Sequence, residues 1–112
     1  MPLAKLSVAI VTAAMVALAA PAHADPDADF AKQLQGYGIY GPRDYNAWLG
    51  KITCERLRNG LDTTADKSAH FVLINLPSGA ATGESYQFLA AAIGTYCSDQ
   101  VPVLTAAAAH HE

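Results

Sequence analysis

The stretch RDYNAWLGKITCERLRNG, residues 43–60, decides the fold of this chain. Its apolar residues recur at α-helical spacing and extend over more than one side of the helix: Tyr45, Trp48, Leu49, Ile52, Cys54, Leu57 and, just beyond the stretch, Leu61. Asp44 is placed to cap the start of this helix, and Gly60 is placed to end it. An apolar surface of this width predicts contacts on more than one side, so we expect this helix to be the central element.

Three further segments show the same spacing, at about residues 25–36, 63–75 and 82–97. The first begins with Asp25 and Pro26, a pair suited to a helix start. Thr63 and Thr82 are the expected N-caps of the other two. The stretch HFVLINL, residues 70–76, is also compatible with a strand, but the sequence offers no second strand to pair with it. The sequence therefore predicts an all-α fold of four helices.

The C-terminal residues differ from the helical segments before them. The segment SDQVPVLTAAAAHHE lacks an apolar period, contains Pro102 and ends in an alanine run followed by His110–Glu112. Adjacent histidines at a chain end can bind a divalent ion weakly, but nothing here fixes a coordination geometry. We predict a helical domain over residues 25–98 and a flexible tail over residues 99–112.

The first 24 residues have the three parts of a secretory signal peptide. Lys5 precedes the fifteen uncharged residues LSVAIVTAAMVALAA, and Ala22 and Ala24 form a small-residue cleavage motif. The alternative is a membrane anchor, but fifteen residues rise only about 22 Å as a helix, short of the roughly 30 Å hydrocarbon core. We expect cleavage after Ala24, export to the envelope or the medium, and no transmembrane anchor in the mature chain.

Cys54 and Cys97 are the two cysteines of the chain. In a small exported protein, an even cysteine count predicts a disulfide. A metal site would need further thiol or imidazole ligands at short spacing, and a catalytic thiol would need a nearby base. The sequence shows neither pattern, so we expect a bond between the two. Closing a loop of about 43 residues stabilises a fold by roughly 4 kcal/mol in the chain-entropy model.

The net charge of the chain argues against two classes of binding partner, nucleic acids and anionic membranes. Without Lys5, six basic residues stand against ten acidic ones, a net charge of −4. Nucleic acids and anionic membrane surfaces attract basic patches, so we expect neither as a partner. All nine aromatic residues lie after residue 24, which is enough apolar material for a compact core.

Few residues are candidates for chemistry. The sequence has no G-x-S-x-G, H-E-x-x-H or phosphate-binding loop, so we expect no catalytic residue and no enzyme. His70 would need a partner such as Tyr86 or Tyr96 to hold haem or a metal, and we favour a partly exposed histidine at a helix edge. The five tyrosines and Trp48 could line a pocket, but at helical spacing we favour core positions. We expect no metal and no cofactor.

The order of these features resembles that of a known family. An export signal ends in AHADPDADF and is followed by GYGI, by WLGKITCERLRNG and by the pair YC at the end of an alanine-rich helix. This pattern is similar to the small exported domain known as domain of unknown function 732, abundant in mycobacteria and their actinobacterial relatives, over nearly all of residues 25–98. Members often carry a proline after the second cysteine, where this chain has Ser98. The resemblance implies a helical, secreted, disulfide-bonded protein and assigns no catalytic or binding residue.

These observations predict a non-enzymatic interaction module that contacts a protein or a component of the cell envelope through a helix face. The alternative is a carrier of a small apolar ligand such as haem, held between helices. An exposed apolar patch favours the first interpretation, and an enclosed apolar cavity favours the second.

Overall fold

The computed structural model describes residues 25–110, with side chains to residue 109, so the expected signal peptide lies outside the described residues. The elements are α2 (Pro26–Gly36), α3 (Arg43–Arg58), α4 (Ala65–Asn75), α5 (Thr82–Tyr96), the 3₁₀ turn η2 (Ser98–Gln100) and α6 (Val101–His110). The described part contains helices and no strand, which confirms the all-α prediction, and HFVLINL belongs to α4 and its end. None of these helices is both long and apolar enough to span a bilayer.

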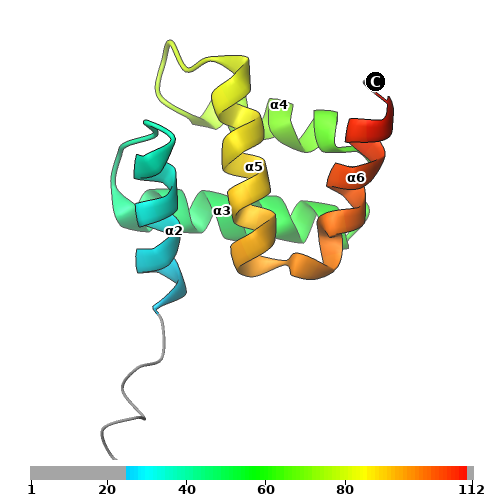
Figure 1. Cartoon of the computed structure of the whole chain (residues 1–112), viewed down its shortest axis with the longest axis horizontal. Helices are drawn as coiled ribbons and strands as arrows, with labels where there is room; N and C mark the ends of the chain where they lie inside the picture. The colour runs from blue at the N-terminus through cyan, green and yellow to red at the C-terminus, as the bar shows by residue number, and fades with distance from the viewer. Residues whose placement is uncertain (1–24, 111–112) are drawn as a thin grey trace, which may run out of the picture.

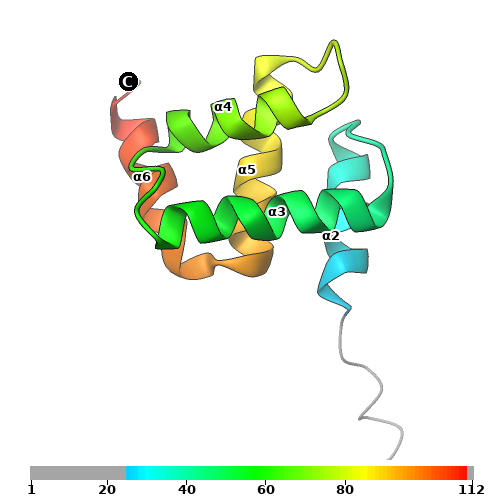
Figure 2. The ribbon, with the colours of Figure 1, turned by 180° about the vertical axis from the view of Figure 1, so that it is seen from behind.

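The helices form two layers (Figures 1 and 2). The helices α3 and α4 lie side by side in one layer, and the Tyr45 hydroxyl near the start of α3 donates a hydrogen bond of 2.7 Å to the carbonyl of Asn75 at the end of α4. The pair is therefore antiparallel. The helices α2, α5 and α6 lie across one face of this pair, and within the described residues no helix covers the other face (Figure 2).

Polar side chains satisfy backbone N–H groups at the starts of α2, α4 and α5, whereas Pro42, the N-cap of α3, makes no side-chain hydrogen bond. Asp25 caps α2 as predicted, because its Oδ1 accepts hydrogen bonds from the N–H groups of Asp27 and Ala28 at 3.1 and 3.4 Å. At the other three starts the predictions were wrong by one or two residues: Pro42, Thr64 and Ala81 are the N-caps, where Asp44, Thr63 and Thr82 were expected. Thr63 carries the same hydroxyl as Thr64, so local sequence could not separate them.

The central element is α5 rather than α3, which corrects the expectation from the wide apolar surface of residues 43–60. The helix α5 contacts every other element, and its buried residues lie all around it: Ser85, Phe88, Leu89, Ala91, Ala92 and Ile93. Part of the apolar surface of α3 is exposed instead, since Trp48 keeps 50% of its surface accessible, and Leu61, just beyond the end of α3, is also exposed.

Close packing between the layers depends on Gly50. The ring of Phe30 on α2 makes edge-on contacts with Phe88 and Tyr96 on α5, with 5.2 Å between ring centroids in each case. A Cβ atom on Gly50 would lie 3.1 Å from ring carbons of both Phe30 and Tyr96. The missing side chain therefore lets α3 approach the aromatic cluster that joins α2 to α5.

The C-terminal residues form a fifth helix where the sequence predicted an irregular tail. Pro102 lies in the first turn of α6, where proline is tolerated because its missing N–H has no partner inside the helix. The alanines that follow have the highest helix propensity of any residue. Val103, Leu104 and Ala107 are partly buried against the helical core, which supplies the contacts that the short helix needs.

Candidate functional site

The two predicted site residues, Cys54 and Cys97, form a disulfide. Their Cα atoms lie 5.8 Å apart, and they keep only 2% and 1% of their surface exposed. Cys54 lies in the last third of α3, and Cys97 is the residue at which α5 ends. The bond therefore joins the two layers inside the core, among Leu57, Leu89 and Ile93. A buried disulfide without a free thiol is a structural link rather than a reactive site.

A second link, which the sequence did not predict, is an ion pair at the end of α3 between buried Asp62 and partly buried Arg56. Asp62 keeps 4% of its side chain exposed, and both of its carboxylate oxygens accept from Arg56, at 2.9 Å from Nε and 3.1 Å from Nη2. The Ser68 hydroxyl on α4 donates to Asp62 Oδ2 at 2.9 Å. The guanidinium of Arg56 also lies 4.0 Å from the ring centre of Phe71 on α4. The loop and both helices are thus fixed together at this end.

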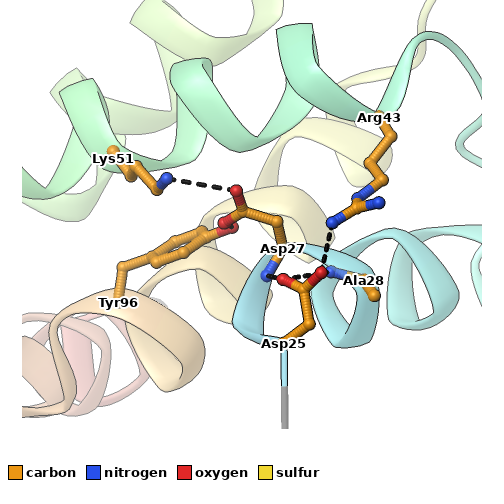
Figure 3. Close-up of polar contacts among 6 residues, drawn as sticks. All are labelled: Asp25, Asp27, Ala28, Arg43, Lys51 and Tyr96. Carbon is orange, nitrogen blue, oxygen red and sulfur yellow. Dashed lines mark hydrogen bonds and ion pairs between the residues drawn. The ribbon is translucent and has the colours of Figure 1, made fainter.

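A third polar cluster joins α2, α3 and α5 (Figure 3). The Tyr96 hydroxyl donates to Asp27 Oδ1 at 2.7 Å, and Lys51 Nζ lies 3.2 Å from Asp27 Oδ2. Burial and the hydrogen bond to Asp27 raise the pKa of Tyr96 well above its ordinary value, so this hydroxyl stays protonated. The same hydrogen bond lowers the pKa of Asp27. Arg43 forms an ion pair with Asp25 beside this cluster.

The pKa values of Asp27 and Tyr96 are both shifted away from neutral pH. Asp27 stays charged, Tyr96 stays neutral, and each satisfies the other. A general acid or base needs a pKa near the working pH, so these shifts suit a structural link and not proton transfer. The arrangement fixes the start of α2 against the end of α5.

The α3–α4 pair carries apolar side chains that are exposed or only partly buried. We define the aromatic face as Tyr45, Trp48, Ile52, Phe71 and Ile74. Trp48 and Ile74 keep 50% and 65% of their surfaces exposed, and the rings of Tyr45 and Trp48 lie 5.8 Å apart. Residues 45, 48 and 52 follow helical spacing along α3, as do 71 and 74 along α4. The hydrogen bond from Tyr45 to Asn75 brings the two rows together.

The aromatic face corrects the expectation that the tyrosines and Trp48 are core residues. Tyr37, Tyr40, Tyr45 and Trp48 are exposed, while Tyr86 and Tyr96 are partly buried. Hydropathy alone could not distinguish the exposed side chains from the buried ones. Buried Leu49 and exposed Trp48 are neighbours in the same apolar pattern along α3. The relevant signal was the width of the apolar surface, which exceeded what the other helices cover.

The residues considered for haem or metal binding do not converge in the described part of the chain. His70 is exposed on α4, and it lines neither of the clefts described below. The hydroxyls of Tyr86 and Tyr96 are engaged with Asp66 and Asp27. Within the described residues there is no cluster of three or more His, Cys, Asp or Glu suited to a metal ion. His110–Glu112, for which we expected no defined metal site, lie beyond the described side chains.

Two surface clefts remain. The first, of about 340 Å³, lies between the start of α4 and α6 and is lined by Thr63, Thr64, Ala65, Asp66, Val103, Ala106 and Ala107. The second, of about 300 Å³, lies between the loops that follow α2 and α4, where Tyr40 faces residues 76–80. Both volumes are at the lower limit of ordinary ligand pockets.

Comparison with known proteins places the chain in a family without an assigned activity. Two curated relatives come from Mycobacterium tuberculosis: the uncharacterized protein MT0585 of strain CDC 1551 / Oshkosh and the uncharacterized protein Rv0559c of strain ATCC 25618 / H37Rv. Each is 55% identical to this chain over 102 residues, which cover 89% of this chain and 91% of the relative. No solved structure matches. The model of the family described as protein of unknown function (DUF732) matches residues 26–99, from the start of α2 into η2, and the chain belongs to this family.

Proposed function

We propose that this protein is an exported, non-enzymatic interaction module that binds a protein partner through the aromatic face. The observation that carries the proposal is the half-exposed Trp48, whose ring lies 5.8 Å from that of Tyr45 on α3, together with exposed Ile74 on the paired helix α4. Contiguous apolar side chains on a small domain are typical of interaction sites. Tryptophan and tyrosine also supply much of the binding energy at interfaces.

The surroundings of the aromatic face suit a protein partner. The Tyr45 hydroxyl is bonded to Asn75, so its ring is held in place and presents an apolar surface. Exposed Asp44 and Glu55 on α3 and exposed Lys67 on α4 place charges of both signs on the same two helices. An apolar centre with a mixed polar rim is the ordinary composition of a protein–protein interface. It offers no single sign of charge that would select a polyanion.

The alternative proposal, a carrier of a small apolar ligand such as haem, has less support. It requires an apolar cavity with a ligating side chain. Two clefts of about 300–340 Å³ in the described part open to the surface, and the candidate ligands Tyr86 and Tyr96 already donate their hydroxyl protons to carboxylates. We therefore rank the interaction module first.

Export is part of the proposal. The cleavage motif before Asp25 and the buried disulfide both suit a protein that matures in an oxidising compartment. The mature form isolated from culture medium or envelope should have an intact mass that begins at Asp25. Full-length protein that retains Met1 in the membrane fraction would contradict export.

Site-directed photocrosslinking tests the interaction. A photoreactive benzoylphenylalanine replaces exposed Glu55, two helical turns from Trp48, and a control probe replaces exposed Gln33 on α2. We expect a discrete crosslinked partner from position 55 but not from position 33 in the native culture. The Trp48→Ala change should abolish the crosslink, whereas Leu61→Ser, at an exposed apolar residue outside the face, should leave it intact. Equal crosslinking from both positions, or crosslinking insensitive to Trp48→Ala, would refute the proposal.

A further inference from the structure

The helix α6 covers an apolar floor beside the disulfide. Val103, Leu104 and Ala107 pack, partly buried, against a buried cluster that includes Ala65 and Ala69 of α4 and Leu89 and Ile93 of α5. Among the helices from α2 to α5, α6 contacts α4 and α5. We define the α6 groove as the part of this cluster that α6 covers between α4 and α5. Its occupant in the structure is a helix of the same chain (Figure 1).

The attachment of α6 differs in kind from that of the other helices. Over residues 101–109, the only side-chain hydrogen bond runs from Thr105 to the carbonyl of Val101, inside α6 itself, at 3.4 Å. By contrast, α2, α3, α4 and α5 are joined by the disulfide and by polar contacts such as those of Asp27 and Asp62. Side chains of α6 at residues 101–109 therefore hold it to the groove by apolar contact alone.

The packing of α6 is also incomplete. A cleft of about 340 Å³ separates Ala106 and Ala107 of α6 from Thr64 and Ala65 at the start of α4. A helix of ten residues is marginal in water on its own, so α6 keeps its form through the contacts of a few side chains. Loss of those contacts would release the helix as a unit.

The chain provides a defined pivot for that release. Arg58 on α3 holds Asp99 through its Nη2, at 2.7 Å from Oδ1, and the Gln100 N–H donates to the carbonyl of Cys97 at 2.8 Å. Up to residue 109, the last hydrogen bonds that tie this segment to the disulfide-linked helices are these at Asp99 and Gln100, immediately before α6 begins. The match of the family model also ends here, at residue 99.

We propose that α6 is a hinged lid, which undocks about residue 100 and opens the α6 groove while α2–α5 stay folded. The closed state is the structure described above, with α6 as the groove's own occupant. The open state exposes an apolar channel of the width of one helix, next to the disulfide and separate from the aromatic face. Regions held by few buried contacts open locally, well below the free energy of global unfolding.

Hydrogen exchange on the mature chain tests the lid. We expect the backbone amides of α6 to exchange at least about 100-fold faster than those of the buried stretch of α5, since only global unfolding exposes the latter. Equal exchange rates in α6 and α5, under native conditions, would overturn the proposal. The dye 8-anilinonaphthalene-1-sulfonate serves as a probe of the opened apolar floor.

Two matched variants separate undocking from general destabilisation. Leu104→Asn removes an apolar contact of α6 with the groove, and Ala108→Asn makes a comparable change in helix propensity at an exposed position of the same helix. We expect Leu104→Asn to abolish protection in α6 and to raise dye fluorescence several-fold, with protection in α3 and α5 unchanged. Ala108→Asn should leave dye fluorescence at the wild-type level. Loss of protection in α5 along with α6, or no dye response to Leu104→Asn, would show that α6 is an integral part of the core.

Discussion

Replacing both cysteines by alanine, Cys54→Ala with Cys97→Ala, removes the covalent link between α3 and the end of α5. The two residues are 43 positions apart, and closing a loop of that length stabilises a fold by about 4 kcal/mol in the chain-entropy model. The two sulfur atoms are also buried in the core, so their loss removes packing worth about 1 kcal/mol more. Alanine keeps each Cβ atom and adds no buried polar group, which makes it a cleaner replacement than serine.

The size of the domain converts this loss into a large thermal shift. For a domain of under 100 residues, each kcal/mol lowers the melting midpoint by about 4–8 °C. The double variant of the mature chain should therefore melt at least about 15 °C below the wild type, followed by circular dichroism in the helical band. Wild-type protein refolded with its thiols reduced should melt close to the double variant.

A neighbouring substitution controls for local disturbance. Ser98→Ala changes an exposed residue next to Cys97 and should move the midpoint by no more than about 2 °C. If the double variant melts within about 5 °C of the wild type, the non-covalent contacts between the layers suffice and the reasoning about the disulfide is refuted.

Three further predictions concern the non-covalent links. Gly50→Ala should lower the urea midpoint in spite of its gain in helix propensity, because the new methyl group presses on the rings of Phe30 and Tyr96. We expect a net loss of about 1 kcal/mol in the free energy of unfolding. A raised midpoint would contradict this packing. Asp62→Asn should cost about 2–3 kcal/mol in urea unfolding since Arg56 loses its buried counter-charge, whereas removal of an exposed ion pair should cost less than about 1 kcal/mol. The pKa of Asp27 is lowered from 3.8, so its contribution to stability is complete above about pH 4 and is lost as the pH falls through the lowered pKa. Urea midpoints measured from about pH 2 to 6 should show this loss. The Asp27→Asn variant should show a weaker dependence of the urea midpoint on pH.

Most of the helices could be predicted from the sequence because local signals determine them. Helical spacing located α2, α3, α4 and α5, and the left-handed Gly60, with φ of +75°, ended α3 as expected. The disulfide followed from cysteine number and expected compartment. The fifth helix, α6, could not be predicted in the same way. An alanine run has high helix propensity but no apolar stripe, so the sequence of α6 shows no helical period.

The candidate site was harder to predict because it depends on which helix covers which. The spacing of Trp48 is the same whether its side chain is buried or exposed, and only the position of α5 decides between them. The role of Asp62 was hidden for a related reason. It follows Gly60 in a loop, where an aspartate is ordinarily solvated, and its burial depends on Arg56 and Ser68 being brought together by the fold.

The two links between α3 and α4 bear directly on the aromatic face. The bond from Tyr45 to the carbonyl of Asn75 fixes the pair at one end, and the contacts of Asp62 with Arg56 and Ser68 fix it at the other. The exposed side chains between these points lie on a support that cannot slide or splay without breaking one of them. A surface held in this way loses less conformational freedom on binding than a mobile one, so more of the apolar contact appears as affinity. The buried charge at Asp62 therefore contributes to the proposed function at a distance, by keeping the aromatic face preformed.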